Sequence, residues 1–302
     1  MSNNQQEKFI LTPILNILIE TRDACKGIGN GIETQSLCDY VMQTTFLKMT
    51  GAIEQKLKCI CWEIATNDYE YRYQYLKKNY GECSTYESKS SVYADLLKSI
   101  KKINPQYNID TLFEDMDVSL KLPELVERKI KKTQKNQERS KKRKLTDDEL
   151  EKLSKGMTAY YTKRGLCNEE KATFSRILMF EKVKNNVDSV VGESLLVSWN
   201  QHNYANYLKI WNRFSDMGFA MGDILFCKEL QEIYTGKIYA HRNRCAHNLT
   251  SYQNNLPTLK TLLSEDYIYE NYFLYFSILI LLDEVFMRLY KKYKETLDSV
   301  VY

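Results

Sequence analysis

The sequence predicts an all-α protein, a multi-helix bundle, on three observations. The 302 residues include only 11 glycines and 4 prolines, so residues that break helices are scarce. Apolar residues recur at intervals of three to five along several long segments, which is the period of a helix that buries one face. No alternation of apolar and polar residues is long enough to predict a sheet.

Composition narrows the class of protein further. Apolar residues make up 43% of the chain and charged residues 27%, as in ordinary globular proteins. The net charge of +4 says little about partners. Eight cysteines without a repeated Cys-x-x-Cys spacing, and three histidines, argue against a zinc site and predict reduced cytoplasmic thiols. We therefore expect neither a metal nor a cofactor.

We also expect a cytoplasmic protein that does not enter a membrane. The first nine residues are polar and lack the order of charged and apolar parts found in a signal peptide. The most apolar run, Tyr272–Leu282, is about half of the ~20 residues that a membrane span needs, and Asp283 and Glu284 follow it. This run predicts a buried helix.

The first region, residues 1–127, predicts several helices in order. They cover residues 9–20, where Pro13 enters or kinks the helix; 37–65, which Ser36 caps after a glycine-rich break; and 92–103, which Asn104-Pro105 ends. Between the last two helices, tyrosines occupy positions 69, 71, 73, 75 and 80. Half-buried packing on an amphipathic helix explains these rings better than stacking on nucleic-acid bases.

The second region, residues 128–145, predicts a mobile basic linker or insertion. Its stretch Arg128–Lys144 contains ten basic residues and one acidic residue, and it has no apolar stripe after Ile130. Such a run either contacts the phosphates of RNA or is a solvated surface. The candidate RNA-binding residues are Lys131, Lys132, Lys141, Lys142, Arg143 and Lys144.

The third region, residues 146–302, predicts further helices. A capping box, Thr146 with Glu149, opens the first helix, which runs to about Lys155. The others cover residues 174–191, 205–214, 222–234 and 268–296, with Gly236 interrupting the chain after the fourth. Trp199, Trp211, Tyr204 and Tyr207 are expected to be core aromatic residues between these helices.

The segment Ile238–Tyr252 carries the residues that indicate chemistry. It should be helical to about Asn248 and contains Arg242, Asn243 and His247. An imidazole can transfer a proton, a guanidinium can hold a phosphate, and an amide can orient either. On RNA the 2′-hydroxyl supplies the nucleophile, so this chemistry needs no metal. The bland alternative is that Arg and His near a helix end serve as surface charges or partners of the helix dipole.

The helical geometry of this segment also bears on assembly. At about 100° per residue, Asn243 and His247 share a face, whereas Arg242 and His247 diverge by about 140°. The arginine must therefore curl across the helix, or a second copy must complete the pair. We expect a symmetric homodimer that brings two copies of the motif into one groove.

The string Arg242-Asn-Arg-Cys-Ala-His247, followed by an asparagine, resembles the Arg-x(4–6)-His motif of the HEPN superfamily. HEPN domains are all-α bundles, and many are metal-independent ribonucleases that act as dimers in toxin–antitoxin systems, abortive infection and CRISPR effectors. The resemblance covers about Lys171–Thr296 and implies that Arg242 and His247 are catalytic, with Asn243 as the polar residue that follows the arginine.

The segment Leu47–Ala65 also resembles the early helix of some HEPN domains, in which an acidic residue faces the motif. Glu54 is the candidate for that position. The chain is then one HEPN domain with a large middle insertion, or a degenerate N-terminal helical domain joined to a C-terminal HEPN domain. His241 and Arg244 rank below the motif residues, His241 as a second proton-transfer group or polar surface and Arg244 as a phosphate contact.

The function expected from this resemblance is a HEPN-type endoribonuclease that cleaves RNA by 2′-hydroxyl attack, as a toxin-like or antiphage effector. An antitoxin or regulatory partner would silence it. The alternative is a catalytically inert HEPN-like helical module that binds RNA or a protein partner through the basic run and the tyrosines.

Overall fold

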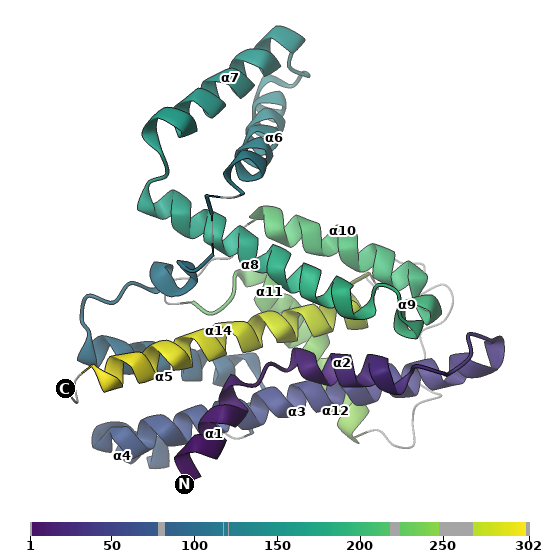
Figure 1. The fold of residues 1–302 in the computed structure, drawn as a ribbon, viewed down its shortest axis with the longest axis vertical. Helices are drawn as coiled ribbons and strands as arrows, with labels where there is room; N and C mark the ends of the chain where they lie inside the picture. The colour runs from purple at the N-terminus through teal and green to yellow at the C-terminus, as the bar shows by residue number, and fades with distance from the viewer. Residues whose placement is uncertain are drawn as a thin grey trace.

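The computed structural model describes residues 2–77, 82–116, 118–119, 121–217, 224–247 and 268–299, and in these ranges the chain is all-helical (Figure 1). No β-strand occurs among the described residues, so the all-α prediction is confirmed. The α-helices are α1 (Ser2–Leu11), α2 (Leu15–Ala24), α3 (Gln35–Asn67), α4 (Tyr69–Lys77), α5 (Tyr86–Ile103), α6 (Leu122–Lys141), α7 (Asp147–Arg164), α8 (Asn168–Val191), α9 (Leu195–Trp199), α10 (Gln201–Met217), α11 (Lys228–Ile233), α12 (Ala240–His247) and α14 (Tyr272–Asp298). Short 3₁₀ helices, η1 (Ile32–Thr34) and η2 (Ile109–Phe113), and a π-helix, η3 (Tyr234–Tyr239), complete the described elements.

Helix α14 lies at the centre of the body. It packs against α3, α5, α8 and α10, and nearly every residue from Phe273 to Asp283 is buried. The prediction of a buried helix from its apolar run is confirmed, and none of the described helices is long and apolar enough to cross a membrane. One hydrophobic core includes residues from Ile10 to Tyr293, so α1–α5 share it with the helices after α7.

The N-terminal segment divides into two helices instead of one. Helix α1 ends at Leu11 and α2 begins at Leu15, with Pro13 between them. Proline lacks the N–H that a continuing helix needs and clashes with the preceding turn. A side chain of another helix stabilises this turn: the backbone N–H of Ile14 donates to Asp283 Oδ2 of α14 (2.8 Å).

Helices α6 and α7 form an arm that projects from the body (Figure 1). The basic stretch Arg128–Lys144 was expected to be a mobile linker, but most of it lies in α6, which ends at Lys141. Its sequence is rich in Lys, Arg, Gln and Glu, which are good helix formers, and its half-buried face meets α7. The capping box at Thr146 and Glu149 is confirmed, although α7 continues past the expected end at Lys155 to Arg164.

The tyrosine-rich segment forms α4, and its described rings differ in exposure. Tyr71 is buried and Tyr75 half-buried, whereas Tyr69 and Tyr73 are exposed. The expectation of half-buried packing therefore holds for one side of the helix, and Tyr80 lies outside the described residues. Among the expected core aromatics, Trp211 and Tyr207 are fully buried, and Trp199 and Tyr204 pack partly buried against the same core.

Candidate functional site

The motif stands at the end of a continuous helical stretch from Lys228 to His247. Gly236, expected to interrupt the chain, lies inside the π-helix η3, which leads directly into α12. The space beside the Cα of Gly236 is open, so a side chain would also fit at this position. π-helical turns are rare in proteins, but those that occur are often found at functional sites. This one immediately precedes the motif.

Arg242 of α12 forms an ion pair with Glu54 of α3. The distance from Arg242 Nη2 to Glu54 Oε2 is 3.0 Å, and the two residues are 188 positions apart in the chain. The Glu54 side chain is 9% exposed and that of Arg242 is 23% exposed, so the pair lies at the edge of the core. Removing one partner from such a pair leaves a poorly solvated charge.

Asn243 supports the same guanidinium. Its Oδ1 accepts a hydrogen bond from Arg242 Nη1 at 3.3 Å. A guanidinium has five N–H donors, so the contacts with Glu54 and Asn243 fix its plane and leave further donors for an anion. The polar amide that follows the arginine in the motif therefore has a direct contact with it.

Lys89 of α5 is a buried cation beside this pair that sequence reasoning missed. It is 1% exposed, and its Nζ donates to the carbonyls of Cys83 (2.5 Å) and Ser84 (2.9 Å). Burial lowers the pKa of Lys89 to about 8, against a smaller opposing attraction from Glu54. Nothing in its Ser-Lys-Ser-Ser surroundings distinguished this lysine from a solvated one.

A second ion pair borders the site. Lys58 of α3 contacts Glu82, and this hydrogen bond lowers the pKa of the Glu82 carboxyl, with Arg242 attracting the same carboxylate. The site therefore places two carboxylates, Glu54 and Glu82, among the cations Arg242, Lys58 and Lys89. This mixed set of charges comes from α3, α5, the residues before α5 and α12.

His241, expected to be a second proton-transfer group or polar surface, packs among aromatic rings. Its ring centroid lies 5.2 Å from those of Phe46 and Tyr272 and 5.6 Å from that of Tyr275. Its Nε2 is 2.9 Å from the Tyr272 hydroxyl. Burial, reinforced by the charge of Arg244, lowers the pKa of His241 to about 4. At neutral pH the ring is uncharged, so it is poorly suited to donate a proton.

This burial predicts a specific pH dependence. A base whose pKa is lower in the folded chain stays neutral while the unfolded chain takes up a proton, so stability falls as pH drops from 6.5 towards 4. For His241 the loss is roughly 2–3 kcal/mol. We expect chemical denaturation at pH 7 and pH 4.5 to show a smaller loss for His241→Phe than for the wild type. The matched control His202→Ala, at an exposed histidine, should keep the wild-type loss; an equal loss in His241→Phe would contradict the assignment.

The structure describes the side chain of Arg244 but not that of His247. Arg244 is exposed, with Nη2 3.4 Å from His241 Nδ1. His247 is the last residue of α12, and its side chain lies outside the described part of the chain. The regular α-helix from Ala240 to His247 retains the register expected from the sequence, in which Arg242 and His247 are about 140° apart.

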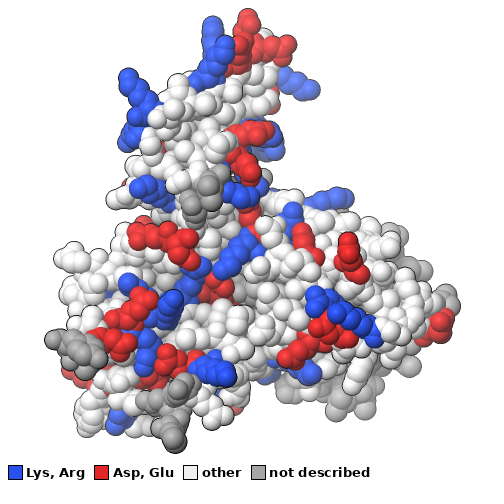
Figure 2. Space-filling model, viewed as in Figure 1, with Lys and Arg blue, Asp and Glu red and all other residues white. Residues whose placement is uncertain are grey.

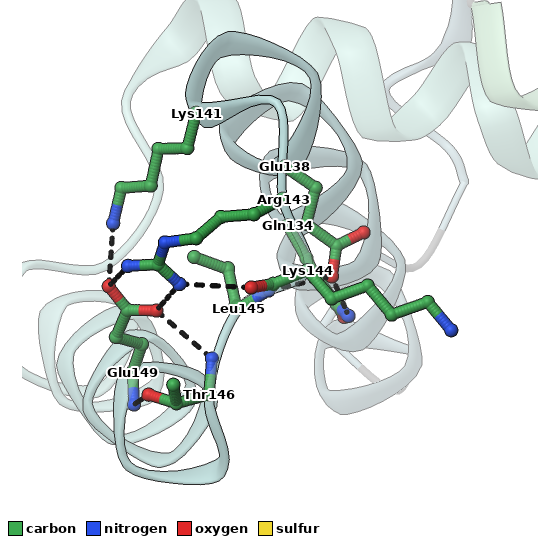
Figure 3. Close-up of polar contacts among 8 residues, drawn as sticks. All are labelled: Gln134, Glu138, Lys141, Arg143, Lys144, Leu145, Thr146 and Glu149. Carbon is green, nitrogen blue, oxygen red and sulfur yellow. Dashed lines mark hydrogen bonds and ion pairs between the residues drawn. The ribbon is translucent and has the colours of Figure 1, made fainter.

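The candidate RNA-binding residues separate into two groups. Lys131 pairs with Glu127 (2.6 Å), and both Lys141 and Arg143 bond Glu149 at the tip of the arm (Figure 3). Lys142 and Lys144 are exposed, and no ion pair to another described residue is found for either; Lys132 is exposed and has a contact within the chain. Half of the expected set is thus engaged by carboxylates.

Within the described ranges, no group of three or more His, Cys, Asp and Glu side chains is arranged to hold a metal ion. Comparisons with known proteins found no match to the chain: no family model matches it, and no curated protein or solved structure is significantly similar. The class that the fold defines is an all-helical protein with a polar Arg–Glu site beside a π-helical turn.

Proposed function

We propose that the chain is a metal-independent endoribonuclease of HEPN type that cleaves RNA as a toxin-like or antiphage effector. The observation that supports this most is the 3.0 Å contact between Arg242 and Glu54. This contact joins the motif on α12 to Glu54 on α3, the acidic residue that the sequence resemblance had indicated without knowledge of the structure. A surface arginine at a helix end would need no such buried partner.

The proposed reaction uses the RNA as its own nucleophile. His247 takes the proton of the 2′-hydroxyl, whose oxygen attacks the adjacent phosphorus, and the bond to the 5′-oxygen breaks. The leaving oxygen receives a proton, and the products are a 2′,3′-cyclic phosphate and a 5′-hydroxyl. Arg242 holds the non-bridging oxygens as negative charge develops on them. A homodimer supplies a second His247 to protonate the leaving oxygen.

The first test is cleavage itself. Purified protein incubated with single-stranded RNA in excess EDTA is expected to shorten the RNA, and gel electrophoresis would record the fragments. RNA that stays whole across diverse sequences while the protein is folded would contradict the proposed activity. Binding without cleavage would instead favour the inert RNA-binding module.

Glu54 acts in this proposal as a positioning residue for Arg242. Glu54→Gln keeps an acceptor but removes the charge, and we expect the cleavage rate at saturating RNA to fall about tenfold. In an Arg242→Ala background the same substitution should cause no further loss, because the group that it positions is gone. Additive losses in the double variant would show that Glu54 does not act through Arg242.

A further inference from the structure

The arm packs against α8 at its base, and ion pairs close the turn at its tip. At the base, Leu125 of α6 packs with Phe174 and Leu178 of α8, while Arg128 pairs with Glu181 and Lys129 with Glu170. Figure 1 shows α6 and α7 running side by side away from the body.

The tip is closed by Glu149, the third residue of α7. Its Oε1 accepts from Arg143 Nη2 (2.9 Å) and Lys141 Nζ (2.8 Å), and its Oε2 accepts from Arg143 Nη1 (2.8 Å) and the Thr146 N–H (3.0 Å) (Figure 3). Glu138 likewise accepts from Gln134 and the Leu145 N–H. Lys141 and Arg143 thus serve mainly to shape the turn between the helices.

Three exposed cations of α6 and the C-cap residue that follows the helix form what we call the basic stripe: Lys132, Lys135, Arg139 and Lys142. The spacing of three and four residues places Lys132, Lys135 and Arg139 on one face of the helix over about 10 Å, and Lys142 follows directly after the last turn. All four side chains are exposed, whereas Thr133, Gln134, Gln137 and Glu138, on the side towards α7, are half-buried. No carboxylate of the described residues forms an ion pair with Lys135, Arg139 or Lys142.

The composition of the basic stripe favours a phosphate backbone over a protein partner. Protein interfaces are centred on buried aromatic or aliphatic anchors and are depleted in lysine, and the exposed side of α6 from residue 131 offers no apolar side chain. A row of cations without anchors suits phosphates, which are bound by displacing counterions. Figure 2 shows Lys and Arg side chains extending from the arm into solvent.

We propose that the basic stripe binds the backbone of single-stranded RNA and holds the substrate at a distance from the Arg242 site. This inference rests on the proposed function for its substrate class. The arm and the Arg242 site lie on different parts of the fold, so binding at one and cleavage at the other can be measured separately.

The test uses the full chain carrying His247→Ala, in EDTA, so that binding is measured without cleavage. Lys132→Gln, Lys135→Gln, Arg139→Gln and Lys142→Gln are combined, and fluorescence anisotropy with a labelled single-stranded RNA is recorded at several salt concentrations. We expect affinity to fall by at least about tenfold at 100 mM salt, and the slope of log K against log salt to become shallower by about 3.

The control removes four charges from exposed lysines of the body, Lys8, Lys98, Lys209 and Lys291, each changed to glutamine. Equal weakening in the control and the stripe variant would overturn the inference, since net charge alone would then explain binding. Polyglutamate is the competitor that represents an acidic protein. If it competes as strongly as RNA, and if its affinity also falls in the stripe variant, the stripe binds acidic proteins and the inference is overturned. If RNA binding depends on the stripe but the wild-type chain never cleaves RNA, the inference about the stripe holds and the proposed nuclease activity is contradicted.

Discussion

Replacing Asp283 by leucine is expected to lower the free energy of unfolding by about 3–5 kcal/mol. Asp283 Oδ1 lies 2.5 Å from Lys56 Nζ, and the two side chains are 3% and 5% exposed. Asp283 also accepts from the Ile14 N–H, and Lys56 donates to the Thr12 carbonyl (2.5 Å). The pair therefore ties the turn between α1 and α2 to α3 and α14, and losing the carboxylate leaves a buried ammonium unpaired.

Urea denaturation of single and double variants would measure this effect. The double variant Lys56→Met with Asp283→Leu should recover most of the lost stability, because no buried charge is left without a partner. The exposed pair Glu151–Lys155 provides the control, where Glu151→Gln should change stability by less than about 0.5 kcal/mol. If Asp283→Leu alone costs no more than the double variant, the pair is not the constraint that its geometry indicates.

Replacing His247 by alanine is expected to lower the rate of RNA cleavage by roughly 10²–10⁴-fold, because no other side chain in the motif can take the proton. His241, the nearest alternative, has a pKa held at about 4 by its burial among Phe46, Tyr272 and Tyr275. Arg242→Ala is expected to lower the rate by roughly 10²–10³-fold through lost stabilisation of the transition state.

Single-turnover cleavage by each variant, with circular dichroism to verify folding, would measure these losses. His202→Ala is the matched control, since this histidine is exposed on α10, and it should cleave at the wild-type rate. Mixing Arg242→Ala chains with His247→Ala chains should restore part of the activity, because the shared groove of the mixed dimer then holds one Arg242 and one His247. A His247→Ala chain that cleaves normally would remove the residue from the mechanism.

Local patterns predicted much of the fold. Helix period, the capping box at Thr146 and the apolar run after Asn271 identified α3, the start of α7, and α14, because each depends on residues close in sequence. The basic run of α6 was expected to be a mobile linker because it is polar and has no apolar stripe after Ile130. The helix that packs against its half-buried side, α7, comes later in the chain. Charge alone does not prevent a helix when its residues favour one.

The motif residues of the candidate site could be predicted from the sequence, whereas most of the residues that surround them could not. Arg242 and Asn243 are recognisable from spacing, and Glu54 from a resemblance, but the burial of His241 depends on rings from α3 and α14. Lys89 lies on α5 beside the site, and its neighbours in the sequence are serines, which gave no indication of its burial. Such residues become visible only when helices distant in sequence meet, and the π-helical turn at Gly236 likewise depends on the packing of the stretch that contains it.

The central claim, that RNA supplies the nucleophile to the Arg242–His247 site, is tested most directly with one oligonucleotide pair. An RNA cut by the wild-type protein in EDTA should carry a 2′,3′-cyclic phosphate at the new end, as mass spectrometry can establish. The same RNA with a single 2′-deoxy nucleotide on the 5′ side of that bond should stay uncut there. Cleavage of the 2′-deoxy bond, or a 3′-hydroxyl at the new end, would contradict the account.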